Sequence, residues 1–329
     1  MNPKKRRKVI LDVDTGSDDA VAILAALLSE ELDVLGICTV WGNLEVEQTT
    51  YNTLALVSAL GMETPVYAGC SRSMVKDRTP ARVSGGKLEP ILKDGKMLAM
   101  HPRRLPGLPD TERTPETLHA VEYYYQALRE ATEPVNIVAV APLTNLGFLF
   151  RLAPELAGKV GELVIMGGGL GVTNASSCGE ANTWHDPEAL QILLDAGLSP
   201  LLVTLDATHS AALTEEDCAL LEGTGTFAGR FAAGLIRQRI GYEQARFPGR
   251  GDWSPVHDAL AVCALLDPSL LTRVEEAHCR IECTGACDGE VLVDRRARPQ
   301  PPNARLALEA DRKRFAALLT HLLGKGGQS

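Results

Sequence analysis

The sequence predicts an α/β fold built on one open, mostly parallel central sheet with flanking helices. Short apolar runs alternate with amphipathic segments along the whole chain, which is typical of strand–helix–strand units. The 329 residues are 45% hydrophobic and 23% charged, the composition of a globular protein with a large core. The sequence shows no internal repeat, and no change of composition marks a linker. We therefore predict a single domain over residues 1–329.

The alternation is clearest in the first two thirds of the chain. Six apolar runs have the length of buried strands, and the five segments between them carry the apolar spacing of helices. Strands joined through helices run parallel, because the crossover returns the chain to the same end of the sheet. The predicted strands are 9–13, 34–40, 66–68, 135–140, 162–166 and 201–205, and the predicted helices are 20–30, 45–60, 117–131, 143–152 and 187–196.

The last third of the chain predicts further helices and a closing meander of strands, which makes the sheet mixed. The first of these helices begins with Thr-Glu-Glu-Asp, the form of a capping box. The predicted helices are 214–222, 228–239, 257–266 and the terminal 312–323, and the predicted strands are 274–283, 290–294 and 304–308.

One irregular segment, 69–115, interrupts this order. It is dense in Pro, Gly, Lys and Arg and too long for an ordinary connection. Because it follows the carboxyl end of a predicted strand, we interpret it as an inserted flap that is either a lid or a mobile surface loop.

Charge excludes several classes of partner. The net charge is −9 although segment 4–8 is basic throughout, and such an acidic body argues against a nucleic-acid groove. The basic segment resembles a nuclear import signal, but it directly precedes the first predicted strand, which favours a solvated lead-in. With no apolar run of membrane-spanning length and no signal-peptide pattern, we expect a cytoplasmic protein without membrane or nucleic-acid partners.

Eight cysteines are scattered along the chain, which favours reduced thiols over a disulfide framework. Cys279, Cys283 and Cys287 are evenly spaced and could bind a metal ion. However, Cys279 and Cys283 would share one face of a strand, and no CxxC pair occurs. We therefore expect no cysteine metal site.

The most informative motif places four aspartates, Asp12, Asp14, Asp18 and Asp19, within eight residues after the first apolar run. A glycine turn separates the predicted strand from the following helix, so these acids crowd the carboxyl end of a strand, where open α/β sheets bind ligands. Helix capping explains Asp18 or Asp19 but leaves the other two without a role. Four carboxylates so close together would repel one another unless a cation lies among them, and oxygen ligands favour Ca²⁺ or Mg²⁺.

Two other segments add polar groups. His257 and Asp258 open an otherwise apolar helix, which alone suggests an N-cap with a solvated histidine, but a metal bound by one loop commonly takes a ligand from a distant segment. Met166 precedes three glycines that do not match the dinucleotide pattern GxGxxG. The following residues Asn174, Glu180 and Asn182 either form a polar surface loop or bind sugar hydroxyls.

These motifs together resemble those of the inosine-uridine-preferring nucleoside hydrolases, in order and over nearly the whole chain. The resemblance implies a Rossmann-like nucleoside hydrolase core that cleaves the N-glycosidic bond of ribonucleosides, and a homodimer or homotetramer. The matching motifs are Asp12-x-Asp14-x-Gly16-x-Asp18-Asp19, Trp41-Gly42-Asn43, Ala141-Pro142-Leu143-Thr144-Asn145, Met166-Gly167-Gly168-Gly169, the Asn174/Glu180/Asn182 spacing, His257-Asp258 and the stretch 302–319.

The resemblance also implies residue roles. A Ca²⁺ ion would be held by Asp14, Asp19, Asp258 and the backbone carbonyl of Val140. Asp14 would take the proton from the attacking water and Asn43 would orient it, while Asp12 would be a supporting acid. The implied substrate-binding residues are Asp18, Asn182 and Asp258 for the ribose 2′- and 3′-hydroxyls, Asn174 and Glu180 for the 5′-hydroxyl, and Met166 beside them.

The sequence departs from the family pattern on the side of the pocket that would hold the base. His257 is our candidate for assisting the leaving base. Several relatives carry a His-Gly pair where this chain has 81–86 without a histidine. We interpret His101 as a surface residue, with base contact as the alternative, and Tyr242 and Arg246 as a helical pair that either covers the base or simply packs.

Two other functions compete with this one. A phosphohydrolase of the haloacid dehalogenase type would use Asp12 as nucleophile with Mg²⁺, but it would leave Asp18, Asp19 and His257 unused. A non-catalytic nucleoside- or ribose-binding protein would need neither Asp14 as base nor His257 as acid.

Overall fold

The computed structural model describes residues 5–79, 82, 89–93, 95–247 and 249–325. Its centre is an eight-stranded sheet of order β11-β14-β8-β7-β6-β1-β2-β3, in which every neighbouring pair is parallel except β11 and β14. The predicted fold class is confirmed. The strands are β1 (Arg7–Val13), β2 (Leu32–Thr39), β3 (Val66–Ala68), β6 (Val135–Ala139), β7 (Val160–Met166), β8 (Leu201–Val203), β11 (Leu271–Ala277) and β14 (Ala304–Ala310).

Strand β1 is the point at which the sheet changes direction. The chain runs outward from β1 to β2 and β3, and then returns to place β6 on the other side of β1. A crevice forms at such a switch point, beyond the carboxyl ends of the two strands. The turn after β1 carries Asp14 and leads into the first helix, whose Asp18 lines a cavity at this crevice.

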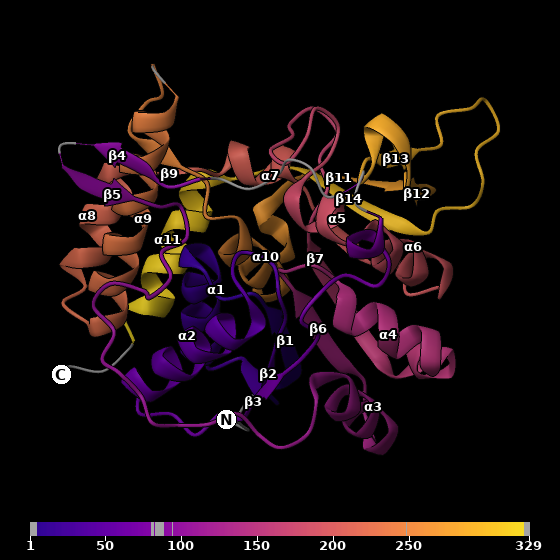
Figure 1. The fold of residues 1–329 in the computed structure, drawn as a ribbon, viewed down its shortest axis with the longest axis horizontal. Coiled ribbons are helices and arrows are strands. Elements are labelled where there is room, and N and C mark those ends of the chain that lie inside the picture. The colour runs from indigo at the N-terminus through magenta and orange to yellow at the C-terminus, as the bar shows by residue number, and fades with distance from the viewer. Residues whose placement is uncertain (1–4, 80–81, 83–88, 94, 248, 326–329) are drawn as a thin grey trace.

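Two hydrophobic cores cover the two faces of the sheet. The side chains of β1 alternate between them, with Leu11 and Val13 in one core and Ile10 in the other, as the two-residue period of a strand requires. Figure 1 shows the two groups of helices on opposite sides of the sheet. The first core is covered by α1 (Ser17–Leu27), α2 (Val46–Ala59), α8 (Glu215–Gly223), α9 (Phe227–Arg246), α10 (His257–Leu266) and α11 (Arg312–Leu323), and the second by α3 (Ala120–Glu130), α4 (Thr144–Leu152) and α6 (Pro187–Asp195).

Short elements fill the connections and include two helices that the sequence did not predict. None of the helices in the described ranges combines the length and the apolar character needed to cross a membrane. The short elements are α5 (Ala181–His185), α7 (Leu205–Ser210), the hairpins β4 (Ile91–Lys93) with β5 (Lys96–Leu98), β9 (Leu213–Thr214) with β10 (Trp253–Ser254) and β12 (Cys279–Ile281) with β13 (Val291–Val293), and the 3₁₀ helices Lys76–Arg78, Pro154–Lys159, Pro268–Leu270 and Gly285–Cys287.

The predicted closing meander is wrong. The predicted strand 274–283 is two strands, β11 in the main sheet and β12 in a separate hairpin. The side chain of Asn303 bonds both the N–H and the carbonyl of Cys279, at 2.7 and 3.0 Å, and so takes the place of a strand partner where the chain leaves the sheet. Similarly, the predicted strand 201–205 ends at Val203, because Thr204 is the N-cap of α7.

Candidate functional site

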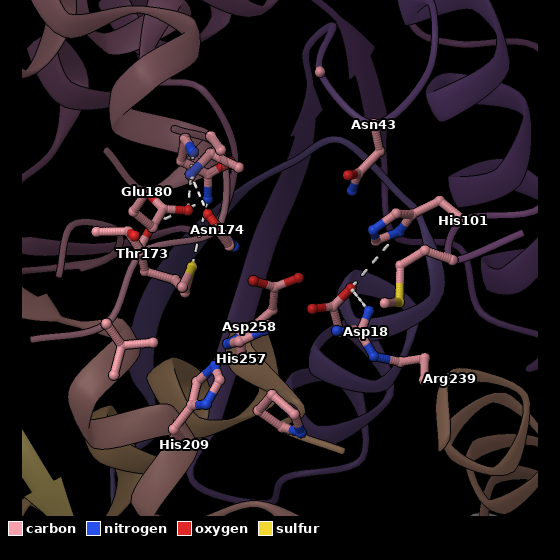
Figure 2. A pocket seen from close by; sticks show the side chains of 18 of the residues that line it. Asp18, Asn43, His101, Thr173, Asn174, Glu180, His209, Arg239, His257 and Asp258 are labelled. Carbon is pink, nitrogen blue, oxygen red and sulfur yellow. Dashed lines mark hydrogen bonds and ion pairs between the residues drawn. The ribbon is translucent and has the colours of Figure 1, made fainter. Parts of the chain in front are cut away.

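A cavity of about 790 Å³ opens beyond the carboxyl ends of β1, β6 and β7. Figure 2 shows the carboxylates of Asp18 and Asp258 facing each other near its centre, with Glu180 and Asn174 on one side and His101 and Arg239 on the other. The cavity therefore gathers side chains from segments that lie far apart in the sequence.

The turn between β1 and α1 is held by its own aspartates. Asp19 accepts the backbone N–H of Gly16 at 2.9 Å and that of Asp14 at 3.0 Å, which satisfies donors at the start of the buried helix α1. The N–H of Asn43 donates to Oδ2 of Asp14 at 2.6 Å, and its side-chain amide donates to Asp19 at 3.2 Å. Gly42 passes so close that a Cβ there would overlap the Asp14 carboxylate. The structure thus places Asn43 directly against Asp14.

Asp258, in the first turn of α10, joins this turn from the other end of the chain. One oxygen of each of Asp18, Asp19 and Asp258 lies within 4.8 Å of the other two, and all three residues are buried. Asp14, which was predicted as a ligand together with Asp19 and Asp258, is not one of this trio, although it lies beside Asp19.

Burial and mutual repulsion act on three carboxyl groups of this cluster, those of Asp14, Asp19 and Asp258. Burial raises the pKa of Asp14 and of Asp258 well above the usual range and that of Asp19 to about 6, and neighbouring carboxylates add to each effect. The Oδ1 atom of Asp14 is buried without a hydrogen-bond partner among the described residues. Buried carboxylates with a free oxygen form an all-oxygen donor set that fits a hard divalent cation.

Asp12 lies on the same face of β1 as Ile10, toward the core that contains Tyr124, and it is completely buried. Its Oδ2 accepts the hydroxyl of Tyr124 at 3.1 Å and the side-chain amide of Asn145 at 3.0 Å. Asp12 therefore links β1 to Tyr124 and Asn145, and it does not line the cavity.

The opposite wall is organised by Glu180 and Asn182. Glu180 caps α5 by accepting the N–H groups of Asn182 and Thr183, at 2.9 and 3.0 Å, and it also accepts the N–H of Gly168 at 3.0 Å. Gly168 has a φ of +75°, which glycine adopts without strain. The glycine segment and α5 are thereby held together.

Asn182 in turn joins the ends of β6 and β7. Its side-chain amide donates to the carbonyls of Val140 and Met166, both at 3.1 Å. Asn174 accepts the N–H of Ala181 at 2.9 Å, and all of the residues predicted to bind substrate line the cavity: Asp18, Met166, Asn174, Glu180, Asn182 and Asp258.

Arg239 was not predicted as a site residue, and its side chain is only 3% exposed. Its guanidinium donates to Asp18 at 2.8 Å and to the hydroxyl of Ser17 at 3.0 Å. Although burial opposes ionisation of Asp18, the positive charge of Arg239 lowers the pKa of that carboxyl. A signal existed in the sequence, because Arg239 follows Leu235 and Ile236 by one helical turn and thus occupies the apolar face of α9.

We expect the substitution Arg239→Met to destabilise the protein by about 3–5 kcal/mol, because it leaves Asp18 buried without its charged partner. Urea unfolding measures this change. The matched control is Arg237→Met on the same helix, since Arg237 pairs with Glu215 and Glu222 at the surface with a 33% exposed side chain; its expected cost is about 1 kcal/mol or less. Equal costs for the two variants would contradict a special role for the buried pair.

A pair of histidines forms the floor of the cavity. The Nδ1 atom of His257 lies 2.7 Å from the hydroxyl of Thr208 on α7, and the ring of His209 is 5.8 Å away. Burial and the charge of Arg239 lower the pKa of His257 to about 3. The ring of His257 is therefore neutral at neutral pH.

The interpretation of His101 as a surface residue is wrong. The segment after β5 returns over the cavity, where Met100 accepts the Ser17 hydroxyl at 3.1 Å, so that the side chain of His101 is only 19% exposed and lies 3.8 Å from Asp18. Burial lowers the pKa of His101 to about 4. Apart from Arg82, the stretch 81–86 lies outside the described residues.

The outer rim of the cavity differs from what was predicted. Tyr242 is buried and donates its hydroxyl to the carbonyl of Glu89 at 2.9 Å, while Arg246 is exposed; neither lines the cavity, so this pair simply packs. Glu243 and Arg250 line it instead, as an ion pair at 2.6 Å. The guanidinium of Arg250 also stacks over the ring of Trp253 at 3.6 Å.

Comparison with known proteins gives consistent results. The sequence profile described as "Inosine-uridine preferring nucleoside hydrolase" matches residues 9–317. The "Pyrimidine-specific ribonucleoside hydrolase RihA" of Citrobacter koseri is 35% identical over 96% of this chain and 97% of its own.

Solved structures show the same similarity. The "Purine-Preferring Ribonucleoside Hydrolase from Gardnerella vaginalis" superposes with a TM-score of 0.84 at 28% identity, covering 98% of this chain and 99% of its own. The "Plant nucleoside hydrolase - PpNRh1 enzyme" superposes with a TM-score of 0.83 at 30% identity, covering 97% of this chain and 99% of its own.

Proposed function

Because the chain belongs to the inosine-uridine preferring nucleoside hydrolase family and is a ribonucleoside hydrolase, we propose that it splits the N-glycosidic bond with a Ca²⁺ ion held in the aspartate cluster. The observation that carries this proposal is the meeting of Asp258 with Asp18 and Asp19 from the two ends of the chain. The products are ribose and a free nucleobase.

The proposed ligands are the carboxylates of Asp14, Asp19 and Asp258 and the carbonyl oxygen of Val140. All are oxygens, as Ca²⁺ prefers, and a backbone carbonyl places no demand on the side chain. The ion would compensate the buried negative charge and polarise the attacking water and the ribose diol.

Asp14 is the proposed general base. The N–H of Asn43 fixes one of its carboxylate oxygens at 2.6 Å, while Oδ1 has no partner among the described residues and can accept a proton. Asn43 thus holds the carboxylate in one orientation, which is what proton transfer in a fixed geometry requires.

The remaining polar residues are proposed to bind and stabilise the ribosyl group. Asp18, Asn182 and Asp258 would bind the 2′- and 3′-hydroxyls, and Asn174 and Glu180 the 5′-hydroxyl, with Met166 beside the sugar. Cleavage of a ribosyl bond passes through an oxocarbenium-like state, and nearby carboxylates stabilise its positive charge.

We expect His257→Ala to slow nucleoside hydrolysis by about 10²-fold and to slow hydrolysis of p-nitrophenyl riboside much less. A nucleobase leaves poorly unless it accepts a hydrogen bond or a proton, and the neutral ring of His257, held by Thr208, can donate one N–H. Initial rates with inosine, uridine and the nitrophenyl substrate measure the difference. His209→Ala is the control, and equal losses on all substrates in the His257 variant would exclude it as the group that assists the base.

A panel of ribonucleosides with and without a chelator tests the proposal as a whole. We expect free ribose from at least one purine or pyrimidine nucleoside, and none after chelation. Binding of a nucleoside without release of ribose would favour the non-catalytic alternative. A phosphohydrolase is disfavoured because Asp12, its required nucleophile, is buried away from the cavity. We also propose a homodimer or homotetramer, as the family resemblance implies, which sedimentation analysis measures.

A further inference from the structure

Two cysteines that the proposed chemistry does not use lie beside the sugar side of the cavity. Cys178 belongs to segment 170–180, whose residues Thr173 and Asn174 line the cavity. Cys287 ends the 3₁₀ helix Gly285–Cys287 between β12 and β13. The two sulfur atoms are 2.9 Å apart, and both residues are half-buried.

The segment of Cys287 is anchored to α5. The hydroxyl of Thr183 donates to the carbonyl of Gly289 at 2.9 Å, and a Cβ at Gly289, which has a φ of +90°, would overlap the backbone of Trp184. This packing gives Cys287 a fixed position next to the wall that Glu180 organises.

The segment of Cys178 is tied to the rest of the molecule at its two ends, where Leu170 and Gly171 donate to Asp206 and Asn174 accepts the N–H of Ala181, and its middle is closed by its own bonds. Its backbone N–H groups at Ala175 and Ser176 share the carbonyl of Gly179, at 3.1 and 3.3 Å, while Thr173 and Asn174 are exposed. Loops that cover a substrate cavity commonly have to move when substrate enters or product leaves. A covalent link at Cys178 would restrict that movement.

The geometry favours a covalent link over a metal site. Glu290 lies near both sulfurs and could join them in binding a metal ion. However, two thiolates on a tetrahedral zinc ion at its usual bond length are about 3.8 Å apart, which is well beyond the observed 2.9 Å. Closing the pair to a disulfide of about 2.05 Å needs only a small movement of the two side chains.

We propose that Cys178 and Cys287 form a reversible disulfide that ties the cavity-lining segment 170–180 to the β12–β13 hairpin and thereby lowers turnover. The cross-link itself does not depend on the proposed function, whereas its effect on turnover rests on it. The disulfide forms under oxidising conditions and breaks under reducing ones, so turnover would depend on the thiol–disulfide balance around the protein.

The oxidant in this scheme is a small-molecule disulfide. The thiolate of Cys178 attacks one sulfur of the oxidant, forms a mixed disulfide and releases one small thiol. The thiol of Cys287 then loses its proton and attacks the Cys178 sulfur, which releases the second small thiol. The two cysteines lose two electrons and two protons, and the oxidant is reduced to two thiols.

The surroundings of Cys287 disfavour its thiolate. Hydrogen bonding to Cys178 and to Glu290 raises the pKa of Cys287 to about 12. The scheme therefore takes Cys287 as the second thiol, and the two single variants test that order.

Oxidised glutathione applied to the full-length protein tests the proposal. We expect peptide mapping to find residues 178 and 287 joined, amide hydrogen exchange to slow across 170–180, and kcat/KM for a nucleoside substrate to fall severalfold. Dithiothreitol should reverse all three changes. The variant Cys287→Ser should stop at the mixed disulfide on Cys178, and Cys178→Ser should show neither species.

Cys283→Ser is the matched control, because Cys283 belongs to the same hairpin region and is also half-buried; it should form the cross-link like the parent protein. All three variants should keep the activity of the parent protein under reducing conditions. The proposal is overturned if both thiols remain open to alkylation after oxidation, if another cysteine pair forms instead, or if the cross-linked protein keeps unchanged exchange and turnover. Retention of one zinc ion that is lost in Cys178→Ser would also overturn it, in favour of a metal site.

Discussion

Replacing Asp14 with asparagine is expected to lower kcat by about 10³-fold, as loss of a general base does, while leaving the fold intact. Asparagine has the same shape and can still accept the N–H of Asn43, but it cannot take up a proton as a carboxylate does. Ribose release measures the loss, and thermal unfolding checks the fold. Full activity in this variant would refute the role of Asp14 as base.

The same substitution two residues earlier provides the control. Asp12→Asn changes a carboxylate within β1, two residues before the turn that carries Asp14, and its partners are Tyr124 and Asn145 rather than Asn43. We expect kcat to change much less than in the Asp14 variant. A loss as large as that of Asp14→Asn would show that the strand, and not a particular carboxylate, accounts for the effect.

Removal of divalent ions is expected to abolish turnover and to lower the thermal stability. Without a cation, the buried carboxylates of Asp14, Asp19 and Asp258 repel one another. A ligand that binds only the folded state at a hundred times its Kd stabilises that state by about 2.7 kcal/mol, so its removal gives a measurable fall in Tm. Added Ca²⁺ should restore both turnover and Tm.

Asp258→Asn supplies the comparison for this experiment. The variant keeps the shape of the side chain but removes one charge from the cluster, so its Tm should respond to Ca²⁺ much more weakly. Unchanged activity and unchanged Tm after prolonged chelation would contradict the metal hypothesis. Restoration by Mg²⁺ at lower concentration than by Ca²⁺ would identify a different ion.

The parallel part of the fold could be predicted from the sequence because each buried strand there is one continuous apolar run. The end of the chain could not, since its strands form partly exposed pairs whose partners depend on single side chains. Asn303 decides that Cys279 leaves the main sheet, and a side-chain bond of this kind has no periodic signature. Short helices such as α5 could not be predicted for a related reason. One cap, at Glu180, starts a helix of only five residues, which is too short to show a periodic pattern.

The site followed a similar division. Residues at strand ends, such as Asp14 and Asn43, could be predicted to meet, because parallel strands deliver their carboxyl ends to one edge of the sheet. Asp258 lies in the first turn of α10, and it was the family resemblance that placed it with them. His101 and Arg250 reach the cavity from connecting segments whose path depends on tertiary contacts, and Glu243 reaches it from the last turn of α9. Arg239 is an intermediate case. Its place on the apolar face of a helix could be predicted from the sequence, but its partner Asp18 could not.

The contrast between the two walls of the cavity has an evolutionary consequence. The inner wall comes from β1, α1 and α10, whose apolar side chains are enclosed by the core, so changes of side-chain size there disturb the packing of the whole molecule. On the outer wall, His101 and Arg250 come from connecting segments, where replacement is tolerated more readily. Sequence changes can therefore accumulate at the mouth of the cavity while the aspartate cluster at its base keeps its geometry.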